Sequence, residues 1–322
     1  MDDFMDAAEG FHIPVVFYWA LLAVLLAVFS VFASHDFKRR QMRTGTVIGY
    51  LLAALPLSFF FGRLIYAAVR YDWLFFDSMG SFSGFLPFFD PSKGGINATG
   101  ILLGCLLAGM ITAYTTRQPA GKILDGIVPY GVLLFALIRF AEPITGQGYG
   151  GWIENPLLPF YPFGIMNDWG EWQLPVCAME GLLALLVSGA LFSLRSQTKK
   201  AGTLTLYALA LLSASQIIPQ SLRQDGVLMI FIFAKVNQIG YMVFLCGPLL
   251  YAGTAALRRG AAKKAILTEW TLMIAGVLLA IGCEYALDKI NLPDLLIYAV
   301  MALAIAGMGA LAVHRIHRED IA

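Results

Sequence analysis

Long runs of apolar residues, separated by short polar segments, repeat along the whole chain. A helix needs about 20 such residues to cross the roughly 30 Å hydrocarbon core of a bilayer. Runs of suitable length lie at residues 13–33, 45–69, 98–114, 121–140, 176–194, 202–219, 228–257, 268–287 and 295–313. The pattern therefore predicts an all-α polytopic membrane protein with about nine transmembrane helices.

The composition fits this class of protein. Hydrophobic residues make up 59% of the 322 residues, charged residues only 13%, and the mean hydropathy is +0.72. Such a chain is embedded in a membrane, and we expect no nucleic-acid partner.

Lysine and arginine are concentrated in alternate loops, which orients the predicted helices. These cations follow the first, third, fifth, seventh and ninth runs: Lys38, Arg39, Arg40, Arg43, Arg117, Lys122, Arg195, Lys199, Lys200, Arg258, Arg259, Lys263, Lys264, Arg315 and Arg318. Short loops rich in lysine and arginine stay on the cytoplasmic side. The N-terminus is therefore expected outside and the C-terminus in the cytoplasm. Because the first residues are acidic, we expect no cleaved signal peptide.

Two segments predicted outside the cytoplasm are rich in aromatic residues. Residues 71–93 combine tryptophan and phenylalanine with Gly, Ser, Pro and Asp, which suits an arm lying in the headgroup layer. Residues 142–175 are rich in Gly and Pro and contain neither Lys nor Arg. Both segments are explained either as the aromatic belt of any membrane protein or as a rim where a lipid meets a water-exposed substrate.

Polar residues within or at the ends of the predicted spans are the candidate functional groups, because a charge in hydrocarbon is expensive unless it is paired. They are Arg63, Arg139, Glu142, Glu180, Gln216, Gln220, Arg223, Lys235, Asn237, Gln238 and Glu284. Most fall in the outer half of their span, which predicts one cavity facing away from the cytoplasm. Arg139 and Glu142 are three residues apart and are expected to pair on one helix face. Lys235 and Glu284 are more simply explained as structural groups.

Cysteine and histidine do not form a metal-binding pattern. The four cysteines lie in apolar segments without a CxxC spacing, and the four histidines lie outside the predicted spans. We therefore expect buried thiols that pack as small hydrophobic groups, and no metal site.

Five segments, in order along the chain, resemble motifs of the prolipoprotein diacylglyceryl transferase family. They are Gly62-Arg63-Leu-Ile-Tyr66, Gly94-Gly95-Ile-Asn97-Ala-Thr99-Gly100, the series Asp125, Pro129, Arg139, Gly146 and Gly150, Leu174-Pro175-Val-Cys-Ala-Met-Glu180, and Arg223 with Gln238. The resemblance implies a transferase-like membrane body of about seven spans at residues 10–257. Residues 258–322 then form two additional transmembrane helices and a short basic tail.

The resemblance also implies an activity. Members of the family move the diacylglyceryl group of phosphatidylglycerol, a phospholipid of the bacterial cytoplasmic membrane, to a lipobox cysteine in the signal peptide of a preprolipoprotein. By resemblance, Arg139, Glu142 and Glu180 are catalytic, with Arg139 stabilising the departing phosphate and Arg63 and Glu180 shaping the pocket. Substrate would be bound by Arg63, Tyr66, Gly94, Gly95, Asn97, Thr99, Gln147, Gly150, Arg223 and Gln238. No cofactor is implied.

The chain departs from the family pattern at several of these positions. Thr99 stands in place of an essential histidine, Glu142 in place of an asparagine, and Gln216 and Gln220 in place of an arginine and a glutamate. Three hypotheses follow. The chain is a lipid transferase in which Glu142 or Glu180 does the work of the histidine, a diverged paralogue that binds lipid without chemistry, or a transporter of an anionic amphiphile.

Overall fold

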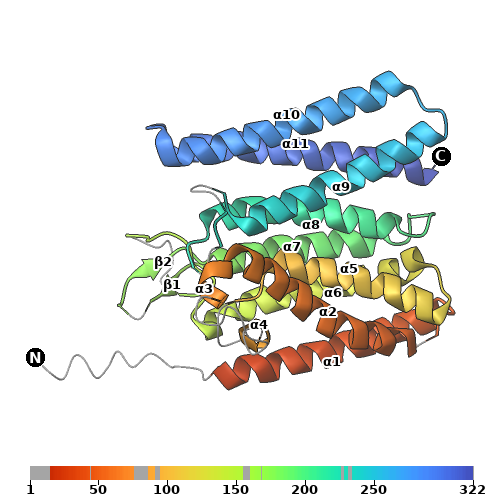
Figure 1. The fold of residues 1–322 in the computed structure, drawn as a ribbon, viewed down its shortest axis with the longest axis horizontal. Helices are drawn as coiled ribbons and strands as arrows, with labels where there is room; N and C mark the ends of the chain where they lie inside the picture. The colour runs from red at the N-terminus through yellow and green to blue at the C-terminus, as the bar shows by residue number, and fades with distance from the viewer. Residues whose placement is uncertain are drawn as a thin grey trace, which may run out of the picture.

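The computed structural model describes residues 15–43, 45–75, 86–90, 95–154, 160–167, 169–225, 228–230 and 234–321. Within these residues the chain is mostly helical, and nine long helices form an elongated bundle (Figure 1). Their bounds are α1 Val15–Arg39, α2 Gly45–Val69, α5 Ala98–Thr116, α6 Ala120–Ala141, α7 Val176–Leu194, α8 Thr203–Leu222, α9 Val236–Arg258, α10 Lys263–Lys289 and α11 Asp294–Ile321. The expectation of an all-α polytopic protein is confirmed at this level.

Eight of the described helices are long and apolar enough to cross a membrane, and α8 is not among them. Although α8 is 20 residues long, it carries hydroxyl and amide side chains, among them Ser213, Gln216 and Gln220, which its neighbours bury. A helix enclosed by other helices need not present an apolar surface to lipid. The chain is therefore a multi-pass membrane protein, and its ninth span stays a prediction.

One predicted helix boundary is wrong, and the expected basic tail is part of a helix. The run expected as a helix at 228–257 becomes helical only at Val236, because the main chain before it pairs with itself: the Val236 N–H donates to the Leu228 carbonyl at 2.9 Å. The expected basic tail is helical, since α11 continues to Ile321. Interactions of its last turns hold it in place, among them Arg315 with Glu269 of α10.

Glycines allow α2 and α5 to pack closely. A Cβ on Gly100 would lie 2.4 Å from the Phe61 carbonyl oxygen, and one on Gly104 would lie 2.5 Å from the Ser58 Cα. Small residues four apart let the backbones of membrane helices approach in this way.

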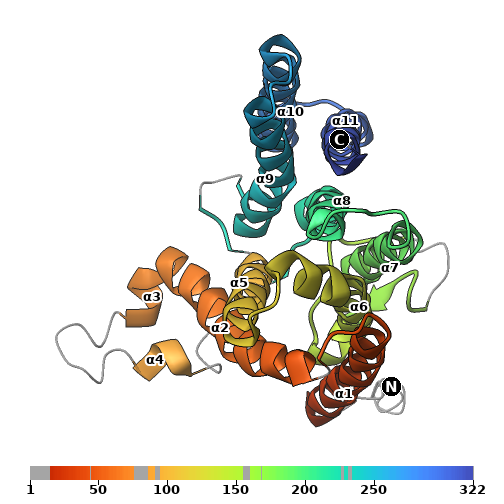
Figure 2. The ribbon, with the colours of Figure 1, turned by 90° about the vertical axis from the view of Figure 1, so that its right-hand side faces the viewer.

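The C-terminal hairpin, α10 with α11, lies along one side of the bundle next to α8 and α9 (Figure 2). It is not a separate unit, because a single apolar cluster contains Leu212 of α8, Leu245 of α9, Met273 of α10 and Met301 of α11. The hairpin therefore buries apolar surface together with the family-like body.

The described parts of the two aromatic segments lie at one end of the bundle (Figure 1). The first contains the short helices α3 (Tyr71–Phe75) and α4 (Leu86–Phe89), and residues 76–85 and 91–94 lie outside the described residues. The second begins with a 3-10 turn, Glu142–Thr145, and contains the antiparallel strands β1 (Ile165–Met166) and β2 (Trp172–Gln173). Helix α1 begins at this end, whereas α11 finishes at the opposite end.

Candidate functional site

Four charged residues from three helices meet at the end of the bundle that carries the aromatic segments. Arg139 ends α6, Glu142 follows it, Glu180 lies near the start of α7, and Arg223 follows α8. Arg139 Nη1 is 2.8 Å from Glu142 Oε2, and Arg139 Nε is 3.0 Å from Glu180 Oε2. Arg223 pairs with both carboxylates as well, at 3.2 Å from Glu180 and at close range from Glu142. Each carboxylate thus bridges both guanidinium groups, and we call these residues the ion-pair cluster.

A fifth charged group, Asp225, joins the cluster through Arg223. Asp225 Oδ2 is 2.9 Å from Arg223 Nη2, and it accepts a hydrogen bond from the Gly148 N–H at 2.8 Å. Sequence reasoning missed Asp225, although its position two residues after an arginine at a helix end was a usable signal. Three carboxylates therefore surround two guanidinium groups, and the arginines are matched by internal anions.

The carboxylates differ in how far a substrate can reach them. Glu180 is fully buried, Gln220 donates to its Oε1, and Gln216 donates to its main-chain carbonyl at 3.2 Å. By contrast, the side chains of Arg139 and Glu142 are 12% and 10% exposed. Arg223, at 9%, has nearly the same exposure as Glu142, so these three side chains keep a small exposed surface while Glu180 has none.

Two tyrosines that sequence reasoning missed lie beside the cluster. Tyr241 of α9 is buried near the Arg139 guanidinium. Tyr18 of α1 is half-buried and lies near Glu142 and Arg139. The Arg139 guanidinium also lies 4.9 Å from the centre of the Phe135 ring, a cation–π contact. Tyrosines near the end of a span are common in membrane proteins, so their sequence positions carried little signal.

Arg63 contacts main-chain carbonyls rather than Glu180, and the expectation that the two residues shape one pocket stays a prediction. Its guanidinium donates to the carbonyls of Phe88 at 2.9 Å, Pro87 at 2.8 Å and Gly95 at 3.0 Å. Carbonyls at a helix end lack partners within the helix, so α4 offers a group of acceptors to a buried cation. Arg63 thereby anchors the first aromatic segment to α2.

Tyr66 and Gly95, both expected to bind substrate, belong to the same region. The Arg63 guanidinium lies over the Tyr66 ring, 5.3 Å from its centre, and Gly95 lies beside that ring. Gly94 lies outside the described residues.

Asn97 and Thr99 form the start of α5. The Thr99 hydroxyl donates to Asn97 Oδ1 at 2.6 Å, and the same oxygen accepts from the Gly100 N–H at 3.1 Å, an N-cap. Both side chains are buried, and Thr99 packs on Gly240 of α9, where a Cβ would lie only 2.4 Å from the Thr99 hydroxyl. Thr99 therefore occupies a tight contact between helices, at the position where the resemblance implies a histidine.

Thr99→His is expected to lower the free energy of unfolding by about 1–3 kcal/mol, because the imidazole would overlap α9 at Gly240. Thermal unfolding of purified protein in detergent measures the effect. Thr115→His, the same change at an exposed site of the same helix, is the control and should unfold like the wild type. Equal stability of the two variants would show that α9 has room for the larger side chain.

The loop that follows Glu142 packs closely, at Gly150, against main-chain atoms of Leu174 and Leu222. A Cβ on Gly150 would lie 2.7 Å from the Leu222 carbonyl, and the Gly150 N–H donates to the Leu174 carbonyl at 2.8 Å. Gln147 is exposed in this loop. Gly150 thus joins the loop to the end of α8, next to Arg223.

Gln238 lies on α9, and its Nε2 donates to Glu284 Oε1 of α10 at 2.6 Å. The same amide reaches the Ile217 carbonyl of α8 at 3.4 Å. The side-chain N–H groups of Gln238 therefore point to α8 and α10.

Asp125, the first residue of the longest resembling motif, lies at the opposite end of the bundle. Its carboxylate accepts from the Gly202 N–H at 2.6 Å and the Thr205 N–H at 2.8 Å, which satisfies the first turn of α8.

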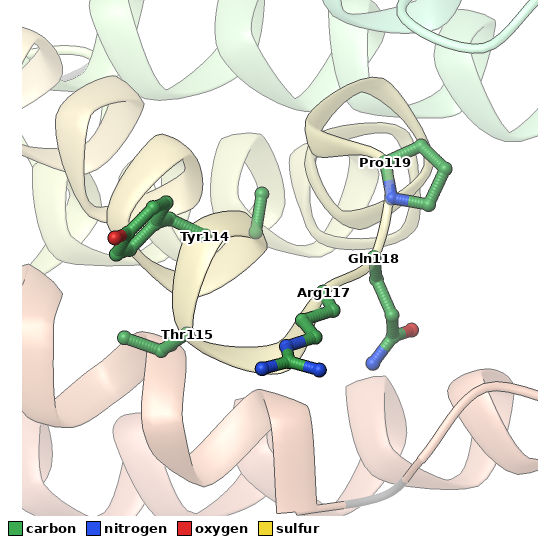
Figure 3. Close-up of a pocket in the computed structure, with 6 residues that line it drawn as sticks. Tyr114, Thr115, Arg117, Gln118 and Pro119 are labelled. Atoms are coloured by element: carbon green, nitrogen blue, oxygen red, sulfur yellow. The ribbon is translucent and has the colours of Figure 1, made fainter.

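A surface hollow lies at the end of α5 and is lined by Tyr114, Thr115, Arg117, Gln118 and Pro119 (Figure 3). It contains no member of the ion-pair cluster.

No group of three or more metal-ligating side chains is arranged to hold a metal ion within the described part of the chain. The ion-pair cluster and its neighbours offer arginines, carboxylates and tyrosine hydroxyls. Paired guanidinium groups suit an anionic substrate such as a phosphate.

Comparison with known proteins adds to this geometry. A family model described as prolipoprotein diacylglyceryl transferase matches residues 8–257. Three similar proteins carry the name phosphatidylglycerol--prolipoprotein diacylglyceryl transferase. The protein of Streptococcus suis (strain 05ZYH33) is 25% identical over 249 residues, covering 74% of this chain and 86% of its own length. The protein of Halalkalibacterium halodurans is 23% identical over 244 residues, covering 74% of this chain and 82% of its own length. The protein of Clostridioides difficile (strain 630) is 24% identical over 219 residues, covering 68% of this chain and 83% of its own length. The family match ends before α10.

Proposed function

The chain belongs to the prolipoprotein diacylglyceryl transferase family, and we propose that it transfers the diacylglyceryl group of phosphatidylglycerol to a lipobox cysteine of a preprolipoprotein. The observation that supports the proposal is the ion-pair cluster, which lies within the matched residues and leaves the Arg139 and Glu142 side chains 12% and 10% exposed. The proposed location is the bacterial cytoplasmic membrane.

In this proposal the cysteine thiol gives its proton to Glu142, and the resulting thiolate attacks the glyceryl carbon that carries the phosphate. The bond between that carbon and the phosphate oxygen breaks, its electron pair stays on oxygen, and glycerol phosphate leaves. Arg139 stabilises the charge on the departing phosphate, because a preorganised cation acts strongly in a site that excludes water. The ion pairs of Arg223 with Glu142 and of Glu180 with Arg139 hold the Arg139 and Glu142 side chains in position.

The proposal includes a nine-span topology with the N-terminus outside and the C-terminus in the cytoplasm. Helix α1 begins at the end of the bundle that carries the aromatic segments, while the loops rich in lysine and arginine follow the other ends of the helices. In this orientation the ion-pair cluster faces the extracytoplasmic side.

A second function, lipid binding without transfer, is favoured by one observation. Both arginines are already matched by carboxylates, and a threonine bonded to Asn97 stands where the resemblance implies a histidine. An incoming phosphate would then compete with Glu142 for Arg139.

Transfer is tested by incubating the purified protein in phosphatidylglycerol vesicles with a synthetic lipobox peptide. We expect mass spectrometry to find the diacylglyceryl group on the cysteine sulfur, and a Cys→Ser peptide to stay unmodified. Unmodified cysteine peptide, together with phosphatidylglycerol that co-purifies with the protein, would instead support lipid binding without transfer.

A further inference from the structure

The C-terminal hairpin begins where the family match ends, yet it contributes polar groups close to the ion-pair cluster. Glu284 of α10 accepts a hydrogen bond from Gln238 Nε2 at 2.6 Å, and Gln238 also reaches the Ile217 carbonyl. Through this one amide, three helices are joined: α8 and α9 of the body and α10 of the hairpin. A hydrogen bond to a carboxylate is stronger than one between neutral groups.

Lys235 connects the same region to Arg223. Its Nζ donates to the Ser221 carbonyl at 2.5 Å and to the Arg223 carbonyl at 2.6 Å, at the end of α8. Burial lowers the pKa of Lys235, whereas the nearby Glu284 carboxylate acts in the opposite direction and favours the charged ammonium. Lys235 thus holds the two carbonyls at the end of α8.

A second residue of the hairpin contacts this end of α8. The Tyr298 side chain on α11 lies near Ser221, the residue whose carbonyl Lys235 binds. The hairpin thus lies beside residues 221–223, the segment from which Arg223 extends to Glu142 and Glu180.

We propose that Glu284 is a positioning residue for the transfer reaction: it orients Gln238, which together with Lys235 fixes the end of α8 and thereby the Arg223 guanidinium in the ion-pair cluster. The proposal rests on the proposed function for its kinetic consequence. Outer groups of this kind orient the residues that touch the substrate, and their loss commonly reduces activity by about 10- to 100-fold.

Three variants test this role. Glu284→Leu removes both the acceptor and the charge, and it should lower kcat/KM for peptide diacylglyceryl transfer by about tenfold, normalised to folded protein. Glu284→Gln keeps an oxygen that accepts from Gln238, and it should stay within about threefold of wild type, because the hydrogen bond is the positioning contact. Asp288→Asn is the matched control, since Asp288 lies one turn further on α10 and pairs only with exposed Lys289 among the described residues.

A double-mutant cycle separates positioning from general loss of structure. If Glu284 acts through Gln238, the double variant Glu284→Leu/Gln238→Leu should be no slower than the slower single variant. Multiplicative effects of the two substitutions, wild-type kinetics of Glu284→Leu, or equal damage by Glu284→Gln and Glu284→Leu would each overturn the proposal.

Hydrogen–deuterium exchange tests the positioning role without relying on activity. Amide exchange in residues 221–225 and 235–239 should accelerate in Glu284→Leu but not in Glu284→Gln or Asp288→Asn. A wild-type protein that transfers no lipid would refute the proposed function alone, and this exchange pattern would still decide the role of Glu284. Unchanged exchange in Glu284→Leu would overturn that role.

Discussion

Arg139→Lys is expected to reduce the rate of diacylglyceryl transfer about 100-fold, the loss typical of removing one preorganised donor from an active site. Lysine keeps the positive charge but cannot present two nitrogens in a fixed fork. Arg139 uses Nη1 for Glu142 and Nε for Glu180, and one ammonium nitrogen cannot reproduce this arrangement of separate nitrogens. Initial rates with a lipobox peptide in phosphatidylglycerol vesicles, normalised to folded protein, measure the effect.

Arg117→Lys is the control for this experiment. Arg117 is exposed at the opposite end of α5 from Asn97, away from the ion-pair cluster, and its replacement should leave the rate unchanged. If Arg139→Lys kept a rate within about threefold of wild type, the fork geometry of Arg139 would have no part in stabilising the departing phosphate.

Arg223→Met is expected to lower the free energy of unfolding by about 3–5 kcal/mol, because it leaves buried Asp225 without its cation and Glu142 and Glu180 with only one of their two. Arg223 pairs with Glu142, Glu180 and Asp225, and its own side chain is only 9% exposed. Equilibrium unfolding in mixed detergent micelles, followed by circular dichroism, measures the loss.

The matched control is Arg259→Met, which removes an arginine that is 45% exposed and pairs with Glu319. An exposed pair contributes at most about 1 kcal/mol, so this variant should be nearly as stable as the wild type. Adding Asp225→Leu to Arg223→Met should restore part of the stability, since one uncompensated charge is removed with it. Equal stability of Arg223→Met and Arg259→Met would contradict the view that the cluster is a buried electrostatic unit.

The sequence predicted the features that depend on local pattern. Apolar runs located the long helices, because membrane helices must satisfy their backbone groups internally and expose apolar side chains to lipid. The spacing of Arg139 and Glu142 predicted their ion pair, because residues three apart lie on one helix face. The ordered motifs led to the family, which the match over residues 8–257 confirmed.

Local pattern failed where a partner comes from a distant part of the chain. The acceptors of Arg63 are carbonyls at the end of α4, which no spacing around Arg63 indicates. Glu284 was explained as a structural group, and its partner Gln238 lies 46 residues away on α9.

The sequence by itself determined the class of protein, most of its helices and its family, because hydrophobic periodicity and residue spacing act over a few turns. Only the tertiary structure decided which charges meet: Arg139, Glu142, Glu180 and Arg223 come from separate segments, and their pairing depends on how α6, α7 and α8 pack. Buried charges must find partners wherever the fold places them, and linear spacing does not encode those distances.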